Sequence, residues 1–403
     1  MRHRATPLPM DEAKQRRAFA DEVIANLQKS GRAGPFTYNA QHFEIEAPNE
    51  RIVLGHVYAK FRDAPAAARA LLTQHFADPR ADAPRTRDEL LACIRPMLRD
   101  RAWLELFAIE HRQLLGEFPG EPLPHALVSE HHVVTLVAWN PQSMATVTQK
   151  TLREFGVSEQ EAFAAAGENL RSIPADFREL RRGLWASAQE DDFDASRLLT
   201  KRARQLGVRG APVAVAANRN ALFITGDADE ENLEALAVVA DKELREPRSL
   251  APLLLRYGDE GWAPWLPPQG SKLRPRFRGW ELKAAIDRYN QQKAALEELE
   301  LRVGAGAHAL EGYFYASLQH DDRGETFALW FPIPTLLPKC EVLCIRAEEN
   351  GPIVRVKWDD ALAAVGDRMQ KLDAYPERWR VEPEGFPTEA ELQRFETARS
   401  PAP

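Results

Sequence analysis

Apolar residues recur at helical spacing in several separate stretches of the chain. Residues 10–29 carry one apolar stripe, made of Phe19, Val23, Ile24 and Leu27. Such a stripe predicts an amphipathic helix. Similar patterns predict helices over residues 57–61, 65–76 and 87–111. A helical hairpin over residues 146–170 turns at Gly156, with Ser158 and Glu161 as a capping box for its second helix.

Other stretches have the short apolar runs that are typical of buried strands. Residues 131–139 have apolar residues on both faces of a strand, at Val133, Val134, Leu136 and Val137, which predicts a central strand covered on both sides. Residues 212–216 and 221–225 predict two more strands. Residues 217–220 form the polar turn between them, where asparagine tolerates positive φ. A further strand is predicted over residues 253–257.

Two aspartates precede helical patterns in this middle region. Asp194 stands before residues 195–206, and Asp229 stands before residues 230–245. Because an aspartate side chain can accept from a free amide of the first turn, each is predicted to be an N-cap. Helices and strands thus alternate in the manner of an α+β layer.

The last third begins with a long helical pattern over residues 280–303. Its apolar seam has alternating spacings of three and four residues and consists of Leu282, Ala285, Tyr289, Gln292, Leu296, Leu299 and Val303. An antiparallel meander is predicted next, with strands over residues 311–319, 326–331, 339–347 and 353–358 and helices over 360–372 and 388–397.

The predicted fold class is therefore α+β, with two mixed α/β layer domains, the second an antiparallel meander packed with helices. Breaker residues around 268–270 suggest the boundary between the domains. The expected organisation is a flexible segment (1–17), an α+β domain (18–268), a basic linker (269–279), a C-terminal α+β domain (280–398) and a tail (399–403).

Composition indicates the cellular compartment and the kinds of partner. The chain has three cysteines without framework spacing, which favours a reducing compartment. Its formal net charge is −7, which is unfavourable for general nucleic-acid binding. The basic start lacks a following apolar stretch, and no run approaches the roughly 18 apolar residues of a membrane span. We therefore expect a cytoplasmic protein with no membrane contact.

One segment concentrates positive charge. In SKLRPRFRGW, basic residues recur at every second position. Pro275 is unfavourable inside a helix, and in an extended chain the cations would share one face. They would then contact phosphate, RNA or an acidic partner, unless the segment is only a solvated linker. The candidate residues are Lys272, Arg274, Arg276 and Arg278.

Acidic residues give weaker indications of chemistry. Asp191, Asp192 and Asp194 could coordinate a cation, or serve as turn and cap residues, and the second interpretation is preferred. In HFEIEA, His42 and two glutamates share a strand face, as metal ligands or as a wet face. Known phosphate-loop, dinucleotide, zinc-protease and hydrolase motifs are missing from the sequence. We therefore predict no cofactor and no metal.

The first two thirds of the chain resemble the YtpQ-like family of bacterial proteins. The resemblance rests on residues 155–158 (FGVS), 166–170 (AGENL), 194–199 (DASRLL) and 212–225. It implies a bacterial, cytoplasmic protein and no established activity. In the family the hairpin turn commonly ends in Arg-Asp. This chain has Arg219-Asn220, which removes the support for an acid–base or metal role of that turn.

Two function hypotheses follow. The leading one is a non-catalytic binding protein, whose partner is another protein or a second copy of the chain. It would use the hairpin turn (Asn218, Arg219 and Asn220) and the basic segment as contact surfaces. The alternative is a hydrolase-like enzyme of unrecognised class, acting on a phosphorylated or acidic ligand. Its candidate residues are Asp192, Asp194, Ser196 and Arg219. Contact with RNA through the basic segment is a weaker third hypothesis.

Overall fold

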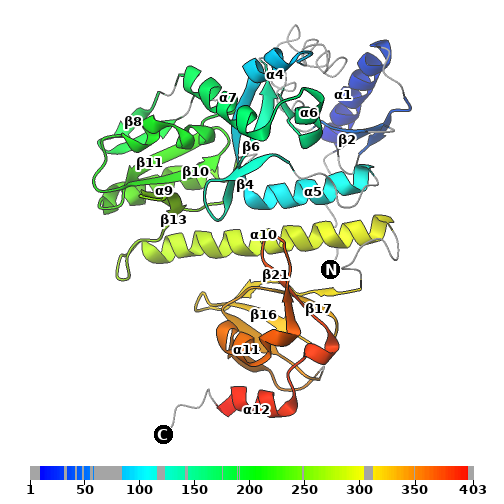
Figure 1. Cartoon of the computed structure of the whole chain (residues 1–403), viewed down its shortest axis with the longest axis vertical. Coiled ribbons are helices and arrows are strands. Elements are labelled where there is room, and N and C mark those ends of the chain that lie inside the picture. The colour runs from blue at the N-terminus through cyan, green and yellow to red at the C-terminus, as the bar shows by residue number, and fades with distance from the viewer. Residues whose placement is uncertain are drawn as a thin grey trace.

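The structure is a computed structural model of the 403-residue chain (Figure 1). It describes residues 10–30, 34–40, 43–47, 50–54, 58, 84–115, 123–140, 144–174, 176–187, 189, 191–246, 249–303, 312–348 and 350–397. Helices and several sheets are both present, so the predicted α+β class is confirmed. The helices predicted over 57–61 and 65–76 fall outside the described residues except for position 58, and so does His42.

A 30-residue helix, α10 (Arg274–Val303), lies across the middle of the molecule. Figure 1 shows the N-terminal elements on one side of α10 and the C-terminal elements on the other. The described part of its predicted seam is buried or partly buried, including Tyr289 and Leu296. Phe277 packs on the N-terminal side and Tyr289 on the C-terminal side. This one helix therefore contributes side chains to the hydrophobic cores of both halves of the chain.

The first helix, α1 (Met10–Lys29), has the predicted bounds. It covers a three-stranded antiparallel sheet of β1 (Thr37–Asn39), β2 (Glu44–Ala47) and β3 (Glu50–Val53). Residues 10–17 are thus helical, although the segment 1–17 was predicted to be flexible. The pairs Glu12–Arg16 and Arg17–Asp21 at i,i+4 spacing stabilise this first part of the helix.

A second sheet replaces part of the helix predicted over residues 87–111. The chain forms α4 (Arg87–Cys93), β4 (Ile94–Asp100) and α5 (Arg101–Leu115) instead. β4 pairs with β6 (His132–Trp139), which also pairs with β5 (His125–Leu127) and β7 (Met144–Thr146). Pro96 cannot donate to a ladder, and the edge position of β4 tolerates it. The helical prediction for residues 87–111 was wrong over β4, because the pairing partner of β4 is distant in sequence.

The helical hairpin and the central strand agree with their predictions. The hairpin consists of α6 (Gln149–Glu154) and α7 (Glu159–Ser172). Gly156 between them has φ +62°, a conformation that glycine adopts without strain. The Ser158 side chain accepts from the Glu161 amide and caps α7. β6 lies inside its sheet, as its continuous apolar run predicted.

The third sheet has six strands in the order β13-β12-β10-β11-β9-β8. Helix α9 (Glu230–Glu243), capped by Asp229 as predicted, covers one face. The other face packs on η1 (Ala195–Leu199) and α8 (Lys201–Arg204). The strands are β8 (Arg178–Arg181), β9 (Leu184–Ser187), β10 (Pro212–Asn218), β11 (Ala221–Gly226), β12 (Leu255–Gly258) and β13 (Gly261–Pro264).

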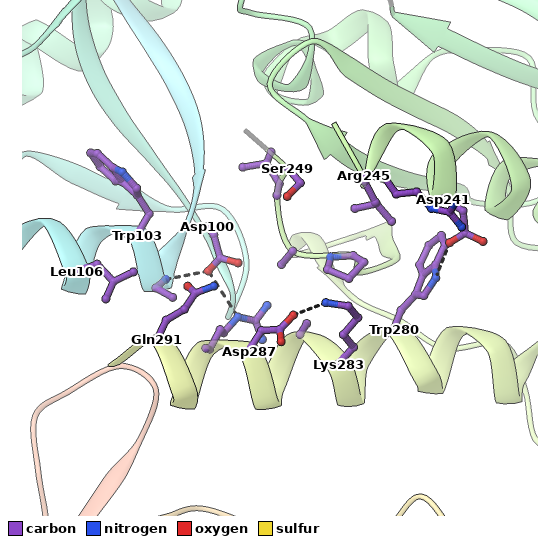
Figure 2. Close-up of a pocket in the computed structure, with 17 residues that line it drawn as sticks. Asp100, Trp103, Leu106, Asp241, Arg245, Ser249, Trp280, Lys283, Asp287 and Gln291 are labelled. Carbon is purple, nitrogen blue, oxygen red and sulfur yellow. Dashed lines mark hydrogen bonds and ion pairs between the residues drawn. The ribbon is translucent and has the colours of Figure 1, made fainter. Parts of the chain in front are cut away.

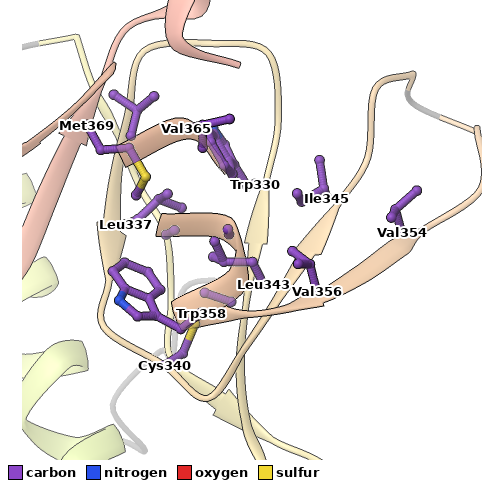
Figure 3. Packing of buried hydrophobic residues seen from close by; sticks show 14 of the residues in the cluster. Trp330, Leu337, Cys340, Leu343, Ile345, Val354, Val356, Trp358, Val365 and Met369 are labelled. Atoms are coloured by element: carbon purple, nitrogen blue, oxygen red, sulfur yellow. The ribbon is translucent and has the colours of Figure 1, made fainter. Parts of the chain in front are cut away.

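The C-terminal half contains two four-stranded sheets around one core (Figure 3). Trp330, Leu343 and Trp358 lie in that core. The first sheet contains β14 (Phe314–Tyr315), β17 (Thr335–Pro338), β21 (Arg378–Val381) and β20 (Met369–Lys371); the second contains β15 (Gln319–His320), β16 (Thr326–Trp330), β18 (Val342–Ile345) and β19 (Val354–Lys357). The remaining elements are α11 (Trp358–Val365), η2 (Gly366–Arg368), η3 (Pro383–Gly385) and α12 (Glu389–Thr397).

This arrangement corrects the predicted antiparallel meander. β16 pairs in parallel with β18, and β14 pairs in parallel with β17. The intervening strand β17 leaves for the other sheet, so β16 and β18 become neighbours through a crossover connection. Whether two strands pair in parallel or antiparallel depends on the connection between them. The alternation of side chains is the same in both cases, so the sequence pattern does not distinguish them.

Candidate functional site

The hairpin turn and the acidic segment lie side by side. The Asp192 amide donates to Asn220 Oδ1 at 3.0 Å, and the Ala195 amide donates to the Arg219 carbonyl at 3.1 Å. Arg219 Nη1 is 3.8 Å from Asp192 Oδ1. Asn218 is occupied within the fold, because its Nδ2 donates to the carbonyl and the carboxylate of Glu243. These bonds fix the turn to the body of the protein.

Asp194 is a buried hydrogen-bond acceptor inside the protein and not the predicted N-cap. Its side chain is fully buried and makes no cap hydrogen bond. It accepts from Ser187 Oγ at 2.6 Å and from the Gln189 amide at 2.9 Å, and Arg197 Nη1 lies 3.2 Å away. The predicted helix 195–206 is divided at Thr200, which caps α8. The prediction was wrong because Asp194 faces the interior and is bonded there.

Ser196 also has a structural contact. Its side chain is fully buried, and its Oγ accepts from the Leu98 amide at 3.0 Å. This bond satisfies an amide on the outer side of the edge strand β4. Asp194 and Ser196 are therefore near Asp192 and Arg219, but their polar atoms are bonded inside the protein.

The basic segment is not extended, because α10 begins at Arg274 and Pro275 stands in its first turn, where proline is tolerated. The predicted single face of four cations is thus wrong. Arg274 donates to the Pro267 carbonyl. Arg276 pairs with Asp241 at 2.6 Å, and Arg278 pairs with Glu341 at 2.7 Å. Lys272 is exposed. Nearby acceptors thus neutralise much of this charge.

Two cavities flank α10 instead. The first, the α9–α10 cavity, has a volume of about 390 Å³. Figure 2 shows Lys283 and Asp287 on α10 at this cavity, which is also lined by Asp100 and Asp241. None of the candidate site residues from the sequence lines it. Its described charged groups are three aspartates and three cations, Arg245, Lys283 and Arg288, so it has no excess of positive charge for an anion.

The second cavity, the junction cleft, lies between the two halves of the chain and has a volume of about 420 Å³. Its polar wall comes from segments far apart in the sequence: Arg101, Glu130, His131, Arg288, Tyr289, Lys339, Lys371, Asp373, Tyr375 and Glu377. It too contains none of the candidate residues from the sequence. The volume is in the range of small-molecule sites, which is roughly 300–1,000 Å³.

A histidine–tyrosine pair crosses this cleft. His131 Nδ1 lies 2.7 Å from the Tyr375 hydroxyl. Burial, followed by the charges of Arg288, His132 and Arg101, lowers the pKa of His131 to about 3. Burial raises the pKa of Tyr375 above its ordinary value. Both groups are thus uncharged at neutral pH. The guanidinium of Arg101 lies 4.5 Å from the centre of the Tyr375 ring, within cation–π distance.

Arg288 lines both cavities. Its side chain is buried, and its Nε is 3.5 Å from Asp100 Oδ1. Asp100 Oδ1 also accepts from the Ala102 amide at the start of α5, at 2.8 Å. Burial raises the pKa of Asp100, although Arg288 opposes this. A buried cation therefore stands between two cavities with one carboxylate beside it.

Sequence reasoning did not find these residues. His131 immediately precedes His132 at the start of β6, where neighbouring side chains point to opposite faces, so they do not form a ligand pair. His131 lines the junction cleft, whereas His132 is buried with its Nδ1 3.1 Å from Ser129 Oγ. The only available signal for Arg288 was its position next to Tyr289 on the seam of the long helix.

In the described part of the chain, no group of three or more His, Cys, Asp or Glu side chains could hold a metal ion. No helix among the described residues has the length and apolar character needed to cross a membrane. All three cysteines are free thiols.

Comparisons with protein families, with curated proteins and with solved structures found no match. The resemblance to the YtpQ-like family stays a prediction.

Proposed function

We propose that this chain is a non-catalytic binding protein of the bacterial cytoplasm, and that it holds a small ligand in the junction cleft. The observation that carries this proposal is the cleft itself, which has about 420 Å³ and a polar wall drawn from both halves of the chain. Cavities of this size where two units meet are common ligand sites.

The protonation state of the cleft favours binding over catalysis. An effective general acid or base has a pKa near the working pH. The pKa of His131 is lowered to about 3, and that of Tyr375 is raised by burial. The Tyr289 hydroxyl donates to the Glu377 carbonyl at 2.7 Å and accepts from the Lys339 amide. These groups are suited to hold and orient a ligand.

The compartment, the source and the macromolecular partners rest on other observations. Three free thiols, two of them buried, agree with a reducing compartment, and the YtpQ-like resemblance suggests a bacterial source. Arg276 and Arg278 are paired with carboxylates, which disfavours RNA as a partner of the basic segment. A protein partner or a second copy of the chain is proposed as an additional contact, with the Arg219 turn as one surface.

Calorimetric titration with a panel of phosphorylated, carboxylic and uncharged metabolites tests this proposal, with mass spectrometry of the same mixtures for turnover. We expect saturable binding of at least one compound and no conversion. Conversion that is lost in His131→Ala or Tyr375→Phe would replace the proposal with the enzyme alternative. Absence of binding across the whole panel would refute a small-molecule site.

A further inference from the structure

Arg288 is a buried cation with too few partners. Its side chain is 6% exposed. Its Nε and Nη2 atoms are buried, and neither has a hydrogen-bond partner among the described residues. The ion pair with Asp100 at 3.5 Å is the contact that offsets its charge. Buried polar atoms are nearly always hydrogen-bonded in folded proteins. Nε at least faces Asp100, so Nη2 is the donor that indicates a missing acceptor.

The other fully buried arginines show what complete bonding requires. Arg378 is 1% exposed and donates to Gln292 Oε1 and to the carbonyls of Ala316, Leu336 and Tyr289. Arg197 is equally buried and makes a two-pronged contact with Asp191, at 2.8 and 2.6 Å. Arg288 differs from both, because the chain supplies no such set of acceptors around it.

The junction cleft is the more favourable side of Arg288 for an acceptor that carries negative charge. In the α9–α10 cavity, Asp100, Asp241 and Asp287 are balanced by three cations, Arg245, Lys283 and Arg288. Lys283 is paired with Asp287 and Arg288 with Asp100, so this cavity has no excess of positive charge for an anion. In the junction cleft, Arg101 adds a second guanidinium beside the uncharged His131 and Tyr375.

The acidic residues of the junction cleft repel an anion only weakly. Glu377 is paired with Lys371 at 2.6 Å. Glu130 has a side chain that is 70% exposed, and Asp373 is exposed as well. Lys339 is an exposed cation on the same wall. Exposed charges are screened by water and salt, whereas the buried guanidinium is screened much less.

We propose that Arg288, assisted by Arg101, receives an oxyanion of the ligand, a phosphate monoester or a carboxylate, in the junction cleft. A planar guanidinium matches both groups in two-pronged hydrogen bonding. The anion would give the Arg288 guanidinium an acceptor in addition to Asp100. This inference rests on the proposed binding function and specifies the chemistry of its ligand.

Titration calorimetry with inorganic phosphate and with succinate tests the inference on the full chain. The variants are Arg288→Met, Arg288→Lys and the matched control Lys283→Met, which removes one positive charge from the same helix on the α9–α10 cavity. Circular dichroism establishes that each variant is folded. The two probes distinguish a phosphate ligand from a carboxylate ligand.

We expect the wild type and Lys283→Met to bind at least one probe with equal affinity. Arg288→Met should weaken binding about tenfold or more, since hydrogen bonds to charged groups are the strong ones. Arg288→Lys keeps the charge and loses the planar fork, so its affinity should fall between the two. This variant keeps the test decisive if Arg288→Met does not fold.

Three outcomes would overturn the inference. The first is unchanged affinity in both Arg288 variants, and the second is weakened binding in Lys283→Met instead. The third is a wild type that binds neither probe. If that wild type still binds an uncharged compound of the metabolite panel, the binding function stands without an anion site. If it binds nothing, both proposals fail together.

Discussion

Two of the buried arginines, Arg197 and Arg288, are in opposite situations. Arg197 lies under the third sheet with carboxylates of Asp191 and Asp194 within 3.2 Å and with the Pro174 carbonyl as a further acceptor. Arg288 lies where the two halves meet, with a single carboxylate 3.5 Å from its Nε and with no hydrogen bond at its buried Nε and Nη2 atoms. A buried charge that is fully bonded is part of the scaffold, whereas one that lacks acceptors indicates a place for something else.

The comparison gives a criterion for telling structural charged residues from functional ones in a chain without known motifs. The acidic segment around Asp194 looked chemically promising in the sequence, but its groups satisfy one another. The residues around Arg288 come from separate segments, and their bonding is incomplete. Incomplete bonding of a buried group is costly to folding, so it is a stronger indication of a ligand than an accumulation of charge.

The largest effect should come from breaking the Arg197 cluster. Arg197→Met leaves Asp194 fully buried without its cation, so we expect the free energy of unfolding to fall by about 3–5 kcal/mol. Urea denaturation measures the loss. The control is Arg171→Met, which breaks a largely exposed pair with Glu168 and should cost less than about 1 kcal/mol. Similar losses in the two variants would contradict the assignment of Arg197 to the scaffold.

The second effect is a pH dependence of the free energy of unfolding that comes from His132, the neighbour of His131 in the junction cleft. Burial, followed by the charge of Arg288, lowers the pKa of His132 to about 3. The unfolded chain takes up this proton near pH 6.5 and the folded chain does not, so stability falls as pH drops from 6.5 toward 3. Between pH 7 and 5 we expect His132 to contribute a loss of about 2 kcal/mol.

Urea denaturation at pH 7 and pH 5 checks this. His132→Asn should remove that part of the loss, whereas His320→Asn, at an exposed position, should leave it unchanged. The Arg197 cluster should not contribute in this range. Burial would raise the pKa of Asp191, but hydrogen bonds from Arg197 and the Phe193 amide outweigh this and lower it. An equal pH effect in His132→Asn and in the wild type would refute the prediction.

The smallest effect should come from Arg288 in the absence of ligand. Arg288→Met removes a cation with few bonds, and Asp100 keeps its hydrogen bond from the Ala102 amide. We therefore expect the free energy of unfolding to fall by about 1 kcal/mol, much less than for Arg197→Met, because Asp100 loses its cation but is 19% exposed to water and keeps a hydrogen bond. A loss as large as that of Arg197→Met, measured by the same denaturation, would place Arg288 in the scaffold and abolish the comparison.

Local patterns were sufficient for much of the secondary structure. The stripe of Phe19, Val23 and Leu27 predicted α1 with its observed bounds, and Asp229 predicted the start of α9. Periodicity and capping depend on neighbours within one or two turns, and these are present in the sequence. β4 was missed because its hydrogen bonds go to β6, more than thirty residues later, and a short apolar run is compatible with either element.

The candidate site was not predictable in the same way. The order of residues was enough to locate the apolar faces, including the seam of α10 through Tyr289 and Gln292. It did not reveal that both halves of the chain enclose Arg288 beside that seam, or that the Asp194 side chain points into the interior. The physical reason is that burial and bonding of a charge depend on the surfaces that pack around it, and those surfaces come from distant segments.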